Sequence, residues 1–323
     1  MRWKTKARIQ NVVSLIPSSI SYALYYWIQR NIGGLRKVNP ERKLEAAVET
    51  WNLIRKSGHD PRGKVFLEVG TGRVPNIPIS FWLMGARRTI TIDLNPYMKA
   101  ELIVEMLEYI KEYKERIQQV YGSLLDESRF NELLSWATRD CFCLSSFLEF
   151  CHIQYVSPGD AAMTNLPDHS IDFHTSRAVF EHIPPSILVA IVKEGNRIVR
   201  DGGLFVHQID YSDHFSHSDK SISSINFLQY SDSEWARYAG NRYMYMNRLR
   251  HDDVLLMLES LGHRILITEP KTDPRALALL RSGVIEVDGK FRDKAMDVLS
   301  ISGSWIVSQF NSSSDAYTEQ AAD

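Results

Sequence analysis

Two spaced glycines between two carboxylates form the pattern of this 323-residue chain that best indicates chemistry. Residues 65–69 read Val-Phe-Leu-Glu-Val, an apolar run that contains Glu68 and predicts a strand buried on both faces. Gly70 and Gly72 follow, and glycine permits a positive φ and the close approach of a ligand to the backbone. A second β-branched run ends in Asp93, where a carboxylate can accept hydrogen bonds from both ribose hydroxyls of an adenosine ligand. These residues predict a nucleotide-binding strand–turn–helix–strand unit.

The position three residues after Gly72 indicates which nucleotide is bound. Dinucleotide-binding folds place a third glycine there, which lets the following helix pack close to the pyrophosphate. This chain has Pro75 instead, followed by a short apolar run that predicts a helix. An NAD-dependent oxidoreductase, the main alternative from another class of enzyme, is therefore disfavoured.

Two later motifs complete the pattern. Asp160 follows a third predicted strand, and Glu181 and His182 follow a fourth at residues 171–176. With these motifs in this order, the chain resembles the class I S-adenosylmethionine-dependent methyltransferases over roughly residues 63–310. Within that family it is most similar to small-molecule enzymes and to methyltransferases of polysaccharide biosynthesis. The resemblance implies S-adenosyl-L-methionine as the cofactor.

The rest of the chain continues the alternation of strands and helices. Apolar runs at residues 204–209, 264–268 and 304–310 predict three more strands, with amphipathic segments between them. Such alternation predicts an α/β fold in three layers. The resemblance implies a Rossmann-like sandwich whose seven-stranded sheet is mostly parallel, with an antiparallel last strand beside the fifth.

Four segments extend or interrupt the predicted methyltransferase domain at residues 61–310. Residues 1–60 predict a helical extension or lid. Residues 97–151 are too long for a structureless connection, so we expect a helical insertion there. Residues 210–250 follow the fifth predicted strand, where such folds bind ligands, and we expect them to bind the acceptor. Residues 311–323 are small and polar and predict a disordered tail.

The resemblance implies a cofactor site at the carboxyl ends of the first strands. The glycine turn is expected to hold the methionine end of the cofactor. Asp93 is expected to bind the ribose diol, and Asp160 the adenine amine. The expected cofactor-binding residues are Glu68, Gly70, Thr71, Gly72, Asp93, Leu94, Asp160, Ala161, Ser176 and Arg177.

A run of titratable side chains follows the fifth predicted strand. The sulfonium cofactor is already activated, so the protein must align a nucleophile and exclude water. A sugar hydroxyl also needs a base that removes its proton. We expect His214 and Asp210 to be the leading base candidates, with His182 and Asp213 behind them. The same side chains could instead bind a divalent cation that positions a diol, but our prediction is a site without a metal.

Aromatic and cationic side chains dominate residues 235–250. Aromatic faces with polar edges suit sugar rings, and arginines suit carboxylate or phosphate groups. An amphipathic helix that buries its tyrosines and exposes its arginines would explain the same composition. The residues expected to bind the acceptor are Tyr211, Arg237, Arg242, Tyr245 and Arg248.

The composition narrows the class of protein further. The net charge of −1 gives no electrostatic reason to expect nucleic-acid binding. The chain has three cysteines, without the spacing of a zinc site or an even number for disulfides, which indicates a reducing compartment. We therefore expect a cytoplasmic protein.

The N-terminal segment has two interpretations. Four basic residues within residues 2–8 precede an apolar, aromatic stretch from Val12 to Trp27 that Pro17 interrupts. This stretch is neither a spanning helix nor a signal peptide. It either packs on the catalytic domain as a lid or lies on the inner membrane face, with its tyrosines at the level of the headgroups.

These observations predict an O-methyltransferase that acts on a sugar in surface polysaccharide or glycoconjugate biosynthesis. Its expected partners are a small-molecule or glycan acceptor and, through the N-terminal segment, the membrane surface. One alternative is a lipid-like or aromatic small-molecule acceptor, which the apolar N-terminal stretch suits. Another is a non-catalytic binding protein on the same scaffold, although the intact cofactor motifs argue against it.

Overall fold

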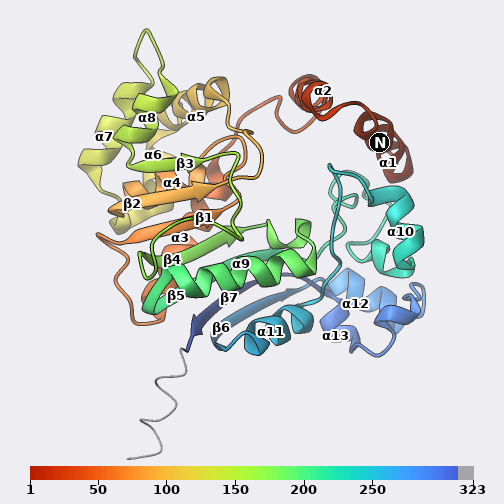
Figure 1. Cartoon of the computed structure of the whole chain (residues 1–323). Coiled ribbons are helices and arrows are strands. Elements are labelled where there is room, and N and C mark those ends of the chain that lie inside the picture. Colours follow the sequence, from red (N-terminus) through yellow and green to blue (C-terminus); the bar gives the residue numbers. More distant parts are fainter. Residues whose placement is uncertain (312–323) are drawn as a thin grey trace, which may run out of the picture.

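A seven-stranded sheet forms the centre of the computed structural model (Figure 1). The structure describes residues 1–311, apart from the side chains of residues 18 and 19. The strands are β1 (Val65–Val69), β2 (Arg88–Ile92), β3 (Ile153–Val156), β4 (Ile171–Arg177), β5 (Val199–Asp210), β6 (His263–Thr272) and β7 (Ile301–Phe310). Their order across the sheet is β3-β2-β1-β4-β5-β7-β6. β1 to β5 pair in parallel, and β7 runs antiparallel to both β5 and β6. The predicted fold class is confirmed.

Helices cover both faces of the sheet. They are α3 (Glu41–Lys56) and α4 (Asn76–Leu83) on one face, and α9 (Pro185–Ile198) and α11 (His251–Ser260) on the other. Alternate residues of β1 point to opposite faces. Phe66 stacks on Trp51 of α3 and Phe81 of α4, with ring centroids 5.8 and 4.3 Å away. Leu67 packs on the other face in the same apolar cluster as Ile191 of α9. Burial on both faces explains why this strand reads as a continuous apolar run.

The long connection between β2 and β3 is helical, as its periodicity predicts. Its helices are α5 (Ala100–Glu112), α6 (Lys114–Tyr121), the short 3₁₀ turn η1 (Gly122–Leu124), α7 (Glu127–Trp136) and α8 (Leu144–Phe150). Leu102, Met106, Phe130 and Phe147 join the apolar core formed by α3 and α4. The insertion therefore widens one layer of the fold and does not form a separate core.

The N-terminal extension consists of two helices separated at Pro17, α1 (Trp3–Ser14) and α2 (Ser18–Asn31). α1 contacts α10 (Asp232–Ala239), which follows β5, and α2 contacts α1 (Figure 1). The ring of Trp3 lies 5.4 Å from that of Phe215 and 4.8 Å from that of Tyr238. The first helix and the segment after β5 therefore share one apolar cluster. Among residues 1–311, no helix combines the length and hydropathy that crossing a membrane requires.

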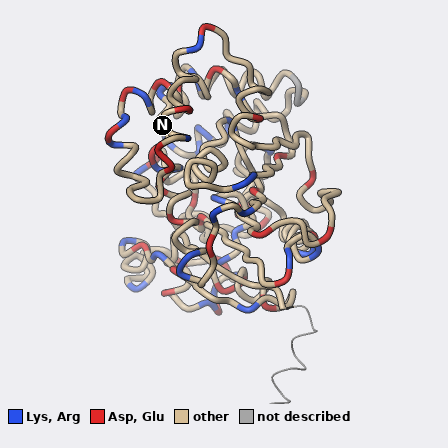
Figure 2. Tube along the Cα trace, turned by 90° about the vertical axis from the view of Figure 1, so that its left-hand side faces the viewer, with Lys and Arg blue, Asp and Glu red and all other residues tan. Residues whose placement is uncertain are grey.

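Short elements complete the described chain. They are η2 (Phe180–His182), η3 (Asn226–Gln229), α12 (Pro274–Arg281), η4 (Gly289–Phe291) and α13 (Met296–Leu299). Of the predicted disordered tail, residues 312–323 lie outside the described part of the chain. Acidic and basic residues are interspersed along the trace (Figure 2), in keeping with the net charge of −1.

Candidate active site

The glycine turn after β1 has the conformation that its sequence predicts. Gly70 and Gly72 have φ values of +85° and +73°. A Cβ atom on Gly70 would lie 2.5 Å from Cγ2 of Val179, closer than two carbon atoms can approach. Both the backbone conformation and the packing against the segment after β4 therefore require glycine at position 70.

Asp93 binds the glycine turn directly. It follows β2, and its Oδ2 accepts a hydrogen bond from the backbone N–H of Gly72 at 2.7 Å. Burial raises the pKa of Asp93 to about 6, and the backbone N–H groups of Gly72, Asn95 and Leu94 oppose this shift. The structure thus brings together the turn and the acid that the sequence separates by about twenty residues.

Glu68 and Thr71 lie beneath the turn. The Thr91 hydroxyl donates to the Glu68 carboxylate at 2.7 Å, and the Thr71 and Thr91 hydroxyls are hydrogen-bonded to each other. Burial raises the pKa of Glu68 to about 8. This buried chain of hydrogen bonds joins β1, the turn and β2, so Glu68 and Thr71 hold the turn in position.

A cavity of about 380 Å³ opens beside the turn, within the usual size range of small-ligand sites. Its walls combine a carboxylate edge with apolar side chains from the segment after β4 and from α9. The expected cofactor residues that line it are Gly70, Asp93, Leu94, Asp160 and Ala161. Val179, His182, Ile183 and Ile187 also line it. A larger cavity, of about 1280 Å³, lies between α8 and the starts of β2 and β3 and contains none of the predicted site residues.

The last two expected cofactor residues lie apart from this cavity. Ser176 is buried, and its hydroxyl is hydrogen-bonded to Nδ1 of His207 at 2.8 Å. Arg177 lines a neighbouring cavity of about 320 Å³ together with Asp210 and Ser212. Burial lowers the pKa of Arg177, and Glu181 and Asp210 oppose this shift. The Ser176 side chain therefore belongs to the core, and Arg177 lies at the neighbouring cavity beside the end of β5.

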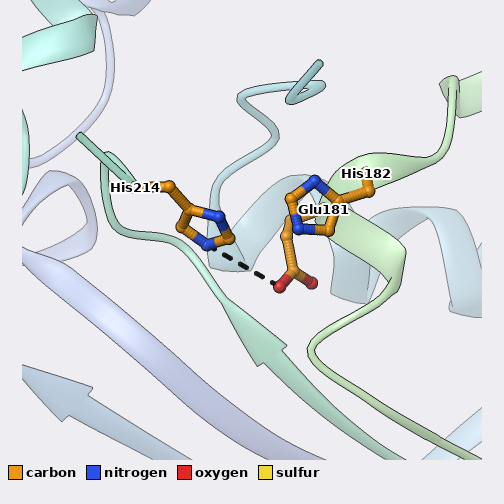
Figure 3. Close-up of side chains that lie close together, drawn as sticks. All are labelled: Glu181, His182 and His214. Carbon is orange, nitrogen blue, oxygen red and sulfur yellow. Dashed lines mark ion pairs between the residues drawn. The ribbon is translucent and has the colours of Figure 1, made fainter. Parts of the chain in front are cut away.

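Four titratable side chains meet where β4 and β5 end side by side. Asp210 is the last residue of β5. Glu181 and His182 belong to η2 after β4, and His214 lies in the loop after β5 (Figure 3). Nε2 of His214 lies 3.3 Å from Oδ2 of Asp210 and 4.0 Å from Oε1 of Glu181. The rings of His182 and His214 meet edge to face, with centroids 4.8 Å apart. Three of the four predicted catalytic residues are thus brought together, along with Glu181.

The two carboxylates of this cluster have pKa values shifted in opposite directions. Glu181 is only 3% exposed, and burial raises its pKa to about 8, although nearby backbone N–H groups oppose the shift. Burial also acts to raise the pKa of Asp210, but His214 and Ser212 outweigh it and lower that pKa to about 2. Burial lowers the pKa of His182, as does the nearby His214. Neighbouring acids with such separated pKa values are typical of acid–base sites.

Asp213, the fourth predicted catalytic residue, is not part of the cluster. Its Oδ1 accepts from the backbone N–H of Phe215 at 2.8 Å, and its Oδ2 accepts from the side-chain amide of Asn226 at 2.9 Å. The carboxylate is fully buried and shapes the loop after β5. His217, which we did not predict as a site residue, lies beside the cluster, with its Nε2 3.7 Å from Oδ2 of Asp210.

Two of the expected acceptor-binding residues are held by protein groups. The Arg248 guanidinium donates to the carbonyls of Phe227 and Tyr230 and forms an ion pair with Asp232. The buried Tyr211 hydroxyl lies 3.4 Å from both Nδ1 of His251 and the Ser304 hydroxyl. In this structure both side chains hold the segment after β5 in place.

The other three lie where that segment meets the N-terminal helices or η2. Arg242 donates to the carbonyl of Ser14, and the carbonyl of Arg237 accepts from the side chain of Asn11. The carbonyl of Tyr245 accepts from Nδ1 of His182 at 2.9 Å. Among these three, Tyr245 therefore has a direct contact with the four-residue cluster.

One family comparison bears on this geometry. Residues 133–207, which run from α7 to β5, match the family model described as a methyltransferase domain. The order of the seven strands, with β7 inserted antiparallel, is the one that the resemblance to class I methyltransferases implies. The match identifies a methyltransferase domain in this chain. A search of curated proteins gave no match.

Solved structures of methyltransferases share parts of this fold. A SAM-dependent methyltransferase of Methanosarcina mazei has 13% identity and a TM-score of 0.43, with 80% of this chain and 96% of that one covered. The magnesium protoporphyrin IX methyltransferase of Synechocystis, solved with bound SAH, has 11% identity and a TM-score of 0.45, with 95% and 99% covered. Phosphoethanolamine N-methyltransferase 2 of Haemonchus contortus has 14% identity and a TM-score of 0.44, with 82% and 52% covered. Likenesses at this level say nothing about the acceptor.

The residues of the 380 Å³ cavity fit the cofactor of this methyltransferase. The glycine turn leaves free the space that a Cβ at position 72 would enter. Asp93 offers an anionic acceptor at the cavity edge, and Val179, Ile183 and Ile187 offer apolar walls that suit a flat adenine ring. These residues would hold S-adenosylmethionine, which supplies an activated methyl group.

We did not predict the cluster of tyrosines that lies near the cofactor cavity. Tyr22 and Tyr25 of α2 pack on Tyr243, with ring centroids 5.9 and 4.3 Å away, and Tyr22 also meets Tyr97 at 5.6 Å. The Arg73 guanidinium lies 5.7 Å from the centre of the Tyr97 ring. Arg73 directly follows the glycine turn and Tyr97 lies shortly after Asp93, so the cluster stands beside the cofactor site. The aromatic run at residues 22–27 was the available signal.

Proposed function

We propose that this methyltransferase transfers a methyl group to a hydroxyl of a sugar, in surface polysaccharide or glycoconjugate biosynthesis on the cytoplasmic side of the membrane. One observation carries the proposal. Asp210 and His214 lie 3.3 Å apart at the end of β5, next to His182, which lines the cofactor cavity. In this proposal residues 61–310 are the catalytic domain, residues 1–60 form a lid, and residues 210–250 bind the acceptor.

The Asp210–His214 pair supplies what a hydroxyl acceptor requires. When bound, S-adenosylmethionine supplies a methyl group whose bond to sulfur breaks, with the electron pair left on sulfur, as the bond to the acceptor forms. A neutral amine can attack without a base, whereas a hydroxyl must lose its proton as it attacks. The Asp210–His214 pair is placed to accept that proton.

The tyrosine cluster supports a sugar as the acceptor. Aromatic faces with polar edges suit the alternating apolar and hydroxylated faces of a sugar ring. Tyr22, Tyr97 and Tyr243 provide such faces beside the cofactor site, and Arg73 and Arg242 provide cations that suit an anionic group.

We also propose that the outer face of α1 and α2 rests on an anionic membrane. Large apolar side chains are exposed there, among them Leu15 at 85% and Trp27 at 58%. Residues 1–40 contain seven Lys and Arg residues and no Asp or Glu. Apolar side chains next to an excess of basic residues are typical of helices that lie on membrane surfaces. The exposed apolar residues of these helices are Ile9, Val12, Leu15, Ile20, Leu24 and Trp27.

The same surface favours a second candidate acceptor. A lipid-like small molecule could reach the site from the membrane without a sugar. The two candidates separate in a transfer assay that uses methyl-labelled cofactor with sugar nucleotides, lipid-linked sugars and simple lipid alcohols as acceptors.

Substitution of Asp210 or His214 tests whether the reaction is O-methylation. We expect Asp210→Asn and His214→Ala to lower turnover by about two orders of magnitude or more while the affinity for S-adenosylhomocysteine stays near wild type. His169→Gln, at an exposed position away from the cluster, is the matched control. Methylation of an amine acceptor that Asp210→Asn leaves unimpaired would overturn the proposal of O-methylation.

Liposome flotation tests the membrane contact. The wild-type protein should float with anionic vesicles and lose binding as salt rises, because salt screens exposed charges. Leu15→Glu combined with Trp27→Glu should abolish flotation. Leu256→Glu, at a position of α11 that is 63% exposed, should leave it unchanged. A wild-type protein that does not float at low salt would refute the contact.

A further inference from the structure

We propose that Glu181, His182 and His214 bind a divalent transition-metal ion that holds the hydroxyl oxygen of the acceptor. The inference rests on the proposed function and adds how that oxygen is positioned. One donor atom from each of the three side chains lies within 4.8 Å of the other two (Figure 3). Two of the residues come from η2 and the third from the loop after β5, so the tertiary structure brings the three donors together.

The Glu181 carboxylate is the strongest indication of a missing ligand. It is 3% exposed, and neither of its oxygens has a hydrogen bond of acceptable geometry among the described residues, although the backbone N–H groups of Glu181 and Asp210 lie close enough to lower its pKa. A buried carboxylate without a partner destabilises the fold unless a proton or a cation neutralises it. Figure 3 shows this carboxylate directed toward the ring of His214, the residue to which it forms its marked contact.

The His182 ring is oriented as a metal ligand usually is. Its Nδ1 lies 2.9 Å from the carbonyl oxygen of Tyr245, and because a carbonyl can only accept, Nδ1 carries the proton. The lone pair of His182 is therefore on Nε2. A hydrogen bond from the second ring nitrogen to a backbone carbonyl is the common way in which proteins fix a ligating imidazole.

His214 provides the third donor. Its buried Nε2 has no hydrogen bond of acceptable geometry among residues 1–311, although it lies 3.3 Å from Asp210 and 4.0 Å from Glu181. A lone pair on this nitrogen would point into the space between the two carboxylates.

A second set, Asp210, His214 and His217, is also compact, but it is less suited to an ion. The Ser212 hydroxyl donates to Asp210 at 2.6 Å, so the contact of 2.9 Å between Ser212 and Nε2 of His217 requires that this nitrogen donates. Nε2 of His217 is therefore protonated and cannot ligate. The His217 side chain is also 54% exposed.

The donor types indicate which ions fit. Two imidazoles and one carboxylate suit Zn²⁺, Mn²⁺ or Fe²⁺, whereas Mg²⁺ and Ca²⁺ prefer oxygen ligands throughout. Three protein ligands leave a coordination position open for the acceptor oxygen. The ion would lower the pKa of the bound hydroxyl. The hydroxyl proton then passes to Asp210 and leaves to solvent, while the oxygen forms the new bond to carbon.

Calorimetry on chelator-treated, dialysed protein tests the site directly. Zn²⁺ and Mn²⁺ should bind at one site, and Mg²⁺ should bind at least tenfold more weakly. Glu181→Gln and His214→Asn should each weaken Zn²⁺ binding by about 100-fold or more, since even second-shell changes cost 10- to 100-fold. His217→Gln is the matched control and should keep the wild-type affinity for Zn²⁺. Unchanged S-adenosylhomocysteine binding shows that each variant is folded.

The outcomes separate this inference from the proposed function. Absence of Zn²⁺ binding by the wild-type protein overturns the metal site, and so does a loss in His217→Gln with none in Glu181→Gln. If the chelator-treated enzyme methylates a sugar hydroxyl at full rate, the proposed function is supported and the metal ion is not required. If the protein binds Zn²⁺ through these residues but methylates only amines, the metal site is supported and its role in holding a hydroxyl is refuted.

Discussion

Replacing Asp93 with asparagine should weaken the binding of S-adenosylhomocysteine. In the structure the carboxylate already accepts a hydrogen bond from the backbone N–H of Gly72, and it stands at the edge of the cofactor cavity. Asparagine keeps one oxygen for the Gly72 contact but removes the charge that favours the ribose hydroxyls. The substitution therefore isolates the charge-assisted part of the interaction.

The size of the effect follows from the contacts that are lost. A hydrogen bond to a charged group contributes about 1.5–3 kcal/mol, so the dissociation constant in Asp93→Asn should rise about 10- to 150-fold. Isothermal titration calorimetry at pH 8 measures this change. Asp201→Asn, in the exposed turn within β5, is the matched control and should bind like the wild type.

The pH dependence provides a second, independent test. Burial raises the pKa of Asp93 to about 6. If the ligand binds the ionised form, the wild-type dissociation constant at pH 5 should be about tenfold higher than at pH 8. Asp93→Asn should lack this component. Wild-type affinity in Asp93→Asn, or the same pH profile in both proteins, would refute the assignment of Asp93 to the cofactor.

Three further predictions concern stability and the packing of α2. Arg250→Met should lower the free energy of unfolding by about 3 kcal/mol or more, measured by urea denaturation, because the buried guanidinium donates to three buried carbonyls. Burial raises the pKa of Glu68 to about 8. The wild-type protein should therefore lose stability as pH rises from about 4.5 through 8. In the same assay Glu68→Gln should gain stability relative to wild type between pH 5 and pH 9. Tyr243→Ala removes the stack on Tyr25, whose ring centroid is 4.3 Å away, and should speed hydrogen exchange in α2 with little change in global stability.

Each of these predictions has a control that can contradict it. Arg242→Met, where the exposed guanidinium donates to a single carbonyl, should change stability little; an equal loss in both arginine variants would refute the role of the buried carbonyls. Glu286→Gln, at an exposed position, should show no pH-dependent gain. Unchanged exchange rates in α2 of Tyr243→Ala would show that the stack does not hold α2 in place.

The sheet and the cofactor turn could be predicted because their signals are local. The apolar run at residues 65–69, the positive φ of Gly70 and Gly72 and the acid at Asp93 depend on neighbours in the sequence or on a spacing that the fold repeats. A strand buried on both faces needs no knowledge of which helix covers it.

The arrangement of the segment after β5 could not be predicted to the same degree, because it depends on contacts between distant segments. Nothing near Arg248 in the sequence indicates that its guanidinium meets the carbonyls of Phe227 and Tyr230. The same applies to the stack of Tyr25 on Tyr243, which joins residues more than two hundred positions apart. Residue type indicated which side chains can recognise a ligand, but only the tertiary structure shows which of them are already engaged.

The insertion of β7 between β5 and β6 has a consequence for how the protein is made. Within the described sheet, β6 pairs only with β7. On the ribosome, β1 to β5 emerge first and can pair with one another, but β6 has no strand to join until residues 301–310 have been synthesised. During that interval the open edge of β5 presents unpaired backbone groups, the feature through which nascent chains associate. During the final stretch of translation the β5 edge is therefore exposed to pairing with other chains.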